Sequence, residues 1–234
     1  MKQRSLVVQY VIFSIVSTLL LLSIIVFNIS NKNILTLNDR LIIGIFFIIS
    51  CLIGITLAFY PGWIRRLIKN QSKKQPNKNI KKTNRKRIGH HPDCDKFRSH
   101  TIKIKDRVYC AGCFGLAIGC LISIILMLIY IPLSLSFSSD IFKIFTMLGF
   151  FIIGFVFFEI MINNRNTLIH ILSNSLFVIA FLIIVIGLIE ITGDKIFGII
   201  SIIFSFLWLD TRIQLSKWHH GIICKNCNKS CKMY

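Results

Sequence analysis

The chain has 234 residues, of which 54% are hydrophobic, and it carries 28 lysines and arginines against only 9 acidic residues. The formal charge of +19 raises the possibility of nucleic-acid binding, but the apolar residues form long uninterrupted runs that a soluble nucleic-acid-binding domain does not contain. The composition therefore excludes an ordinary soluble globule and a disordered chain, and it predicts an all-α, multi-pass membrane protein with one basic face.

Six apolar runs are long enough, or nearly so, to cross the hydrocarbon core as helices. In chain order they cover residues 6–29, 41–60, 111–131, 141–162, 168–191 and 196–209. The last run has only 14 residues, so we expect the next turn, 211–215, to complete the crossing with Arg212 reaching out to the interface. The first run is longer than the apolar core of a signal peptide and lacks a small-residue cleavage site, which favours a helix that stays in place.

The distribution of positive charge predicts the orientation. The loops after the first, third and fifth spans lie on one side of the membrane. They hold only four basic residues, which four acidic residues balance. Because positive residues are retained on the cytoplasmic side, we expect both termini, the long loop after the second span and the tail to be cytoplasmic, in the plasma membrane.

The chain accordingly divides into five predicted segments: a two-span hairpin (1–64), a basic linker (65–89), a Cys/His loop (90–113), a four-span bundle (114–215) and a Cys/His tail (216–234). Between Arg65 and Arg87 the linker has eleven basic residues and no acidic one, and we expect it to be disordered and to lie against anionic lipid headgroups. Contact with a ribosome or other RNA is an alternative, although no aromatic residue is present there to stack on bases.

Six of the eight cysteines and five of the six histidines fall in segments predicted to be cytoplasmic, where such clusters hold metal more often than they form disulfides. The loop contains His91-x2-Cys94 and Cys110-x2-Cys113, two pairs whose spacing allows the side chains to converge on one tetrahedral ion. The residues between the pairs alternate apolar and polar, which predicts a small zinc-ribbon-like hairpin with Asp106 and Arg107 at its turn. His100 is an alternative to His91.

The tail contains a second possible ligand set, formed by His220 and three cysteines. Two four-ligand zinc sites are one interpretation, and a single site shared between the loop and the tail is the other. The predicted metal ligands are His91, Cys94, His100, Cys110, Cys113, His220, Cys224, Cys227 and Cys231, for one or two zinc ions. Cys51 and Cys120 fall within spans, where we expect them to be packing residues.

Two other chemistries compete with metal binding. Cys110 and Cys113 stand where the third span begins, and a helix N-terminus favours a reactive dithiol, yet no thioredoxin-like βαβ pattern is present. Glu159 and His170 lie near the ends of the fourth and fifth spans, each with an asparagine one turn later, at 163 and 174. Such groups in a membrane suggest a proton relay, but near the interface a packing pair of Glu159 with His170 or Arg165 is the favoured interpretation.

The segment from Cys94 to Gly119 contains Cys94, then Arg98-Ser99, then Cys110-Ala-Gly-Cys113 and Gly115 leading into a span. This pattern resembles an uncharacterised family of small bacterial and archaeal polytopic membrane proteins. The family motif has a histidine directly after its first cysteine, which this chain lacks, and the cysteine-rich tail is an addition. The resemblance implies that Cys94, Cys110 and Cys113 act as a set, and it implies no reaction.

Together these patterns predict an integral membrane protein with a cytoplasmic zinc-binding Cys/His module that serves assembly or interaction, with a partner membrane subunit as one possible partner. The alternatives are a membrane enzyme or transporter that uses the Cys110/Cys113 dithiol or a Glu159/His170 relay, and ribosome or lipid contact by the basic linker. No nucleotide-binding glycine pattern, metalloprotease helix or serine-hydrolase elbow occurs, so the sequence identifies no enzyme class and no nucleotide partner.

Overall fold

The computed structural model describes residues 2–27, 35–59, 87–88, 100–105, 107–133, 138–162 and 166–225. Within these ranges six helices are long and apolar enough to cross a membrane, as the sequence predicts. They are α1 (Lys2–Val26), α2 (Leu37–Phe59), α4 (Ala111–Tyr130), α5 (Ser139–Met161), α6 (Thr167–Thr192) and α7 (Lys195–Lys225).

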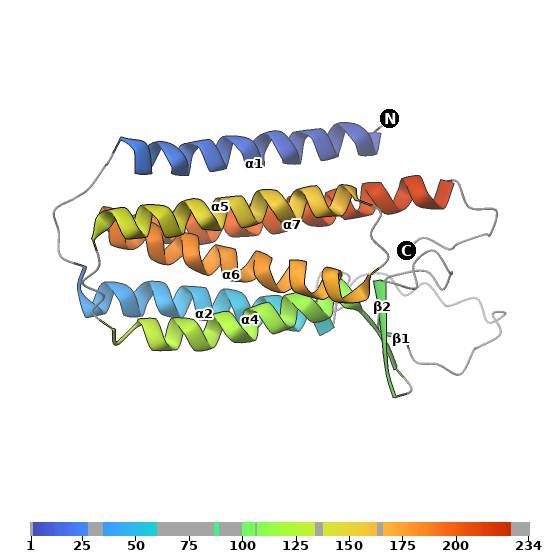
Figure 1. Cartoon of the computed structure of the whole chain (residues 1–234), viewed down its shortest axis with the longest axis horizontal. Coiled ribbons are helices and arrows are strands. Elements are labelled where there is room, and N and C mark those ends of the chain that lie inside the picture. Colours follow the sequence, from blue (N-terminus) through green and yellow to red (C-terminus); the bar gives the residue numbers. More distant parts are fainter. Residues whose placement is uncertain are drawn as a thin grey trace, which may run out of the picture.

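The six helices run roughly along one axis, with α6 inside the bundle (Figure 1). α6 packs against α4, α5 and α7, and α2 packs against α4 and α7. This position agrees with the burial of most residues of α6, whose apolar side chains surround the helix instead of gathering on one face. α1 packs mainly on α7, where Ser14 Oγ lies 2.6 Å from Thr211 Oγ1 and Trp208 Nε1 donates to Ser17 Oγ at 2.9 Å.

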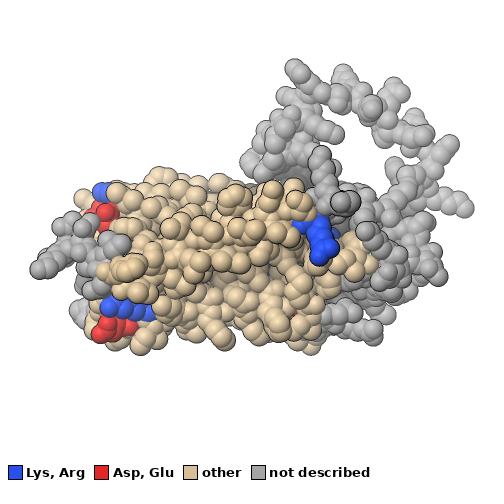
Figure 2. All heavy atoms as spheres, turned by 90° about the horizontal axis from the view of Figure 1, so that it is seen from above, with Lys and Arg blue, Asp and Glu red and all other residues tan. Residues whose placement is uncertain are grey.

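The outer surface of the bundle suits lipid. Among the described residues, lysine, arginine, aspartate and glutamate gather at the two ends of the long axis and leave an uncharged belt between them (Figure 2). Large apolar side chains such as Phe13, Phe151 and Phe158 are more than half exposed on this belt. Side chains of this kind are stable outside a protein core only when another apolar phase covers them, which agrees with a multi-pass membrane protein.

The sixth span is longer than the sequence analysis expects. α7 continues without a break through Lys225, and its membrane-compatible part runs from Lys195 to Ile222. The expected snorkelling of Arg212 is wrong, because its guanidinium turns inward and its Cζ lies 5.6 Å from the ring centroid of the fully buried Phe177. The first residues of α1 and the last of α7 lie at the same end of the bundle (Figure 1).

A small sheet stands at that end. β2 (Thr101–Ile104) and β3 (Arg107–Cys110) form the antiparallel hairpin that the alternating pattern predicts, and β1 (Arg87–Ile88) adds to β3 in parallel. The turn differs from the expectation, because Arg107 pairs with Ile104 and so belongs to β3, while Lys105 lies in the turn. Lys105 has a φ of 52°, the left-handed conformation that a tight hairpin turn requires.

Residues 87 and 88 fall in the segment predicted to be a disordered linker, but they form β1 and so belong to the sheet. The rest of that linker, residues 65–86 and 89, lies outside the described residues, as do Arg165 and Asn163. The proposed contacts of the linker with lipid or RNA therefore remain predictions.

The contact between α4 and α6 is close enough to require glycine. A Cβ atom on Gly115 would lie 2.3 Å from the carbonyl oxygen of Ile171, and one on Gly119 would lie 2.7 Å from that of Ser175. Ser175 Oγ also donates a hydrogen bond to the Gly115 carbonyl oxygen at 2.8 Å. Small residues spaced four apart allow helix backbones to approach in this way inside a membrane. The start of α4, which directly follows β3 of the hairpin, is therefore fixed against α6.

An ion pair ties the helices together at the opposite end. Arg40 Nη2 lies 3.4 Å from Glu190 Oε1, Arg40 Nη1 donates to the Leu133 carbonyl oxygen at 2.7 Å, and Tyr130 donates to Glu190 Oε1 at 2.6 Å. We call Arg40, Tyr130 and Glu190 the loop-end cluster. It joins α2, α4 and α6 through groups that are about nine-tenths buried.

Candidate functional site at the hairpin end

Seven polar, thiol and ionisable side chains gather where the hairpin meets the bundle. They come from the start of β2, the end of β3, α4, α5, α6 and α7, segments far apart in the sequence. We call them the hairpin-end cluster, and its members are His100, Cys110, Cys113, Glu159, His170, Arg212 and His220.

The base of the cluster is a carboxylate and an imidazole inside the bundle. His170 Nδ1 lies 3.1 Å from Glu159 Oε1, and Ser173 donates to Glu159 Oε2 at 3.2 Å. Only 4% of Glu159 and 9% of His170 are exposed. Asn174 donates to the carbonyl oxygen of His170 one turn back, which covers a polar group of the helix backbone. The expected packing pair of Glu159 with His170 is therefore present.

Three histidine rings, including that of His170, contact one another in series. His100, immediately before β2, stacks on His170 with ring centroids 4.2 Å apart and an interplanar angle of 27°. His100 also meets His220 of α7, with centroids 5.2 Å apart and rings nearly perpendicular at 80°. One imidazole of the loop thus contacts both the transmembrane bundle and the helix that leads into the tail.

Two thiols lie where the hairpin joins α4. Cys110 ends β3 and is the N-cap of α4, and Cys113 is in the first turn of the same helix, so a short strand-to-helix junction sets their spacing. Their side chains lie close enough to interact. Arg212 lies within electrostatic range of Glu159, Cys110 and Cys113. Its buried Nε has no hydrogen-bond partner among the described residues.

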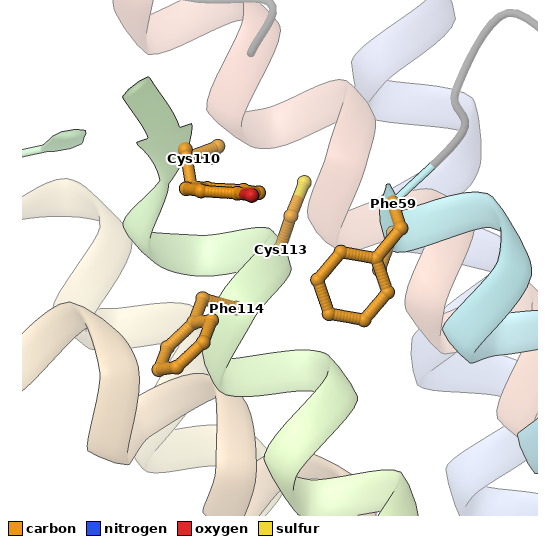
Figure 3. A pocket seen from close by; sticks show the side chains of 6 residues that line it. Phe59, Cys110, Cys113 and Phe114 are labelled. Carbon is orange, nitrogen blue, oxygen red and sulfur yellow. The ribbon is translucent and has the colours of Figure 1, made fainter. Parts of the chain in front are cut away.

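A narrow hollow adjoins the thiols. Figure 3 shows Cys110 and Cys113 with Phe59 of α2 opposite, and Phe114 on the other side of the α4 turn. The hollow is too tight to admit a water molecule. The described part of this end therefore holds closely packed ligand-type groups rather than a pocket for an organic substrate.

The predicted metal ligands divide into three groups. His100, Cys110, Cys113 and His220 all lie in the hairpin-end cluster. The backbone of Cys224 lies in the last turn of α7, one turn after His220. His91, Cys94, Cys227 and Cys231 lie outside the described residues. Within the described ranges, no three His, Cys, Asp or Glu side chains are arranged so as to hold a metal ion.

From the sequence, the metal ligands and the Glu159/His170 pair are separate features, and no contact between them is predicted. The helical spacing of His170 and Asn174 is visible in the sequence, but the contact between His100 and His170 depends on how the loop folds back on α6. The place of Arg212 in the hairpin-end cluster is not predicted from the sequence either, because a cation near a predicted interface is expected to turn outward.

Comparisons with protein-family models, with curated proteins and with solved structures find no match to this chain. The resemblance of the segment from Cys94 to Gly119 to a family of membrane proteins therefore remains a prediction from the motif alone.

Proposed function

We propose that this membrane protein binds zinc at the hairpin end, in one site shared between the Cys/His loop and the tail, and that the metal holds the two segments together as an assembly or interaction module. The observation that carries the proposal is the contact between His100 of the loop and His220 of α7. Of the two arrangements that the sequence permits, this contact favours the shared site.

The spacing of the two rings suits a common ion. Two imidazoles bound through nitrogen to one tetrahedral zinc, at about 2.0 Å each, have ring centroids about 5 Å apart. His100 and His220 are 5.2 Å apart. No three side chains of the described ranges converge as they stand, so the remaining positions would have to come from the other predicted ligands. These are His91, Cys94, Cys110, Cys113, Cys224, Cys227 and Cys231. Zinc with two thiolates and two imidazoles is a common structural site, and it serves to crosslink chain segments.

The proposed location is the cytoplasmic face of the plasma membrane. The positive-charge bias of the loop and tail supports this orientation, as does the presence of an even number of spans, which returns both termini to one side. In the reducing cytoplasm, clustered cysteines bind metal more often than they form disulfides.

The test is the metal content of the full chain, purified in detergent under reducing conditions. We expect about one zinc per chain, lost in Cys110→Ser and in His220→Ala. His219→Ala is the matched control, since it removes the neighbouring imidazole of the same helix and should keep the metal. A folded, reduced wild-type protein without zinc would refute the proposal. Two zinc ions per chain would favour separate loop and tail sites.

The proximity of Cys110 and Cys113 also supports the alternative of a redox dithiol. Alkylation distinguishes the two functions. Thiols bound to zinc resist alkylation until a chelator removes the metal, whereas a reduced dithiol without metal reacts at once and becomes protected after oxidation. Rapid alkylation that is unaffected by chelator would favour the redox function.

A further inference from the structure

We infer that Glu159 and His170 are positioning residues for the ligand His100, so that the metal site rests on the transmembrane bundle instead of on a free-standing hairpin. The inference rests on the proposed function and extends it to two buried groups that no metal motif in the sequence includes.

Distances separate the two neighbours of His100 into different roles. The ring centroids of His100 and His170 are 4.2 Å apart. If a nitrogen of each ring bound one ion at about 2.0 Å, the angle between the two bonds would be roughly 80°, well below the tetrahedral value. The rings of His100 and His170 are also nearly parallel, as in a stacked pair. His220, at 5.2 Å and almost perpendicular, has the spacing of a second ligand. His170 therefore supports the ring of His100 from behind.

The ring of His170 is itself held by a buried carboxylate. Its Nδ1 contacts Glu159 of α5, which Ser173 fixes from the next turn of α6, and its backbone carbonyl accepts from Asn174. The histidine and the glutamate are both at least nine-tenths buried. A buried ring that a carboxylate orients restricts the orientation of the ring stacked on it. Such a restriction lowers the entropy that His100 must lose when it binds metal.

One consequence concerns the helices. Because Glu159 belongs to α5, His170 to α6 and His220 to α7, a metal ion on His100 and His220 would link the hairpin to three membrane-spanning helices at once. Binding energy at the site would then stabilise the packing of these helices, and disturbance of that packing would weaken the site.

The test is zinc affinity, measured by competition with a chromophoric chelator on the detergent-solubilised full chain. Glu159→Gln and His170→Ala should each bind zinc about 10- to 100-fold more weakly, the usual loss when an outer-shell partner of a metal ligand is removed. Glu190→Gln is the control, because it removes a carboxylate of similar burial from the opposite end, and it should leave zinc affinity unchanged. Glu159→Gln is nearly isosteric, so it decides the matter if His170→Ala does not fold.

Cobalt substituted for zinc gives the second measurement. A positioning role predicts that the cobalt absorption of His170→Ala keeps the band energies of the wild type while affinity falls. A shifted spectrum, as expected for loss of a nitrogen ligand in His100→Ala, would show that His170 is itself a ligand and would overturn the inference. Unchanged affinity in both Glu159→Gln and His170→Ala would also overturn it, although the proposed function would stand. A wild type without zinc would overturn both.

Discussion

The two ends of the bundle bury ionisable groups in different ways. At the loop end, Arg40 and Glu190 form an ion pair, and Tyr130 and a backbone carbonyl accompany them. At the hairpin end, one carboxylate and one guanidinium share their space with three imidazoles and two thiols. Each end also has an arginine Nε that is buried without a hydrogen-bond partner among the described residues, so that feature does not distinguish them.

The difference indicates which end has a role beyond packing. A buried pair of opposite charges with matching donors can be explained by the need to fix helices within a membrane. The hairpin end holds more ligand-type groups than a neutral pair needs, and they come from the loop and from α7 as well as from the bundle. Structural pairing alone does not account for such a collection, and the proposed zinc site would give these groups a use.

The largest expected effect would follow from breaking the loop-end pair. Arg40→Met leaves the Glu190 carboxylate buried without its cation, which should lower the free energy of unfolding by about 3–5 kcal/mol. Zinc affinity should not change, since the substitution is at the far end. Denaturant unfolding in detergent measures the first effect and chelator competition the second.

The double variant Arg40→Met/Glu190→Leu is the control, and it should recover most of the lost stability because no charge is then left alone. If the single variant weakened zinc binding as strongly as it weakened the fold, the two ends would not be independent.

An intermediate effect is expected from metal removal. A ligand present at 100 times its dissociation constant stabilises the folded state by about 2.7 kcal/mol. Chelation should therefore lower the melting temperature of the wild-type protein and leave that of Cys113→Ser unchanged. Equal shifts in the two proteins would indicate that the chelator acts elsewhere.

The smallest effect is expected from a second ion pair at the loop end, which is exposed. Lys195 Nζ lies 2.9 Å from Asp39 Oδ1, and 48% of the lysine side chain is exposed. Lys195→Ala should cost less than about 1 kcal/mol, because water and salt screen such a pair. If the same unfolding experiment gave a loss of stability close to that of Arg40→Met, burial would not explain why the two ion pairs differ in strength.

Hydropathy alone predicts the six spans, because each is an apolar run with a clear length requirement. The ends are less well predicted: α7 continues to Lys225, although its polar second half reads from the sequence as a short extension. A helix can continue beyond the apolar run when its neighbours cover its polar residues, as α1 does for Thr211 through Ser14. Such cover depends on a segment almost two hundred residues away and is not visible locally.

The candidate site shows the same division. The Cys-x2-Cys spacing and the alternation of residues 101–109 are local, and they predict the hairpin and the position of the thiols at the start of α4. The contacts of His100 with His170 and His220 join three separate segments, and no periodicity encodes them. The inward turn of Arg212 likewise depends on Phe177 and on partners from other elements.

The backbone contact of α4 with α6 at Gly115 and Gly119 also limits changes in chain length. Because each helical residue turns the chain by about 100°, one residue inserted after Phe114 would leave the glycines in place and rotate both thiols by about that angle. Cys110 and Cys113 would then face a different neighbour, while the span would remain long enough to cross the membrane. An alignment that allows a gap between Cys113 and Gly115 would therefore match sequences that share the helix but not the site.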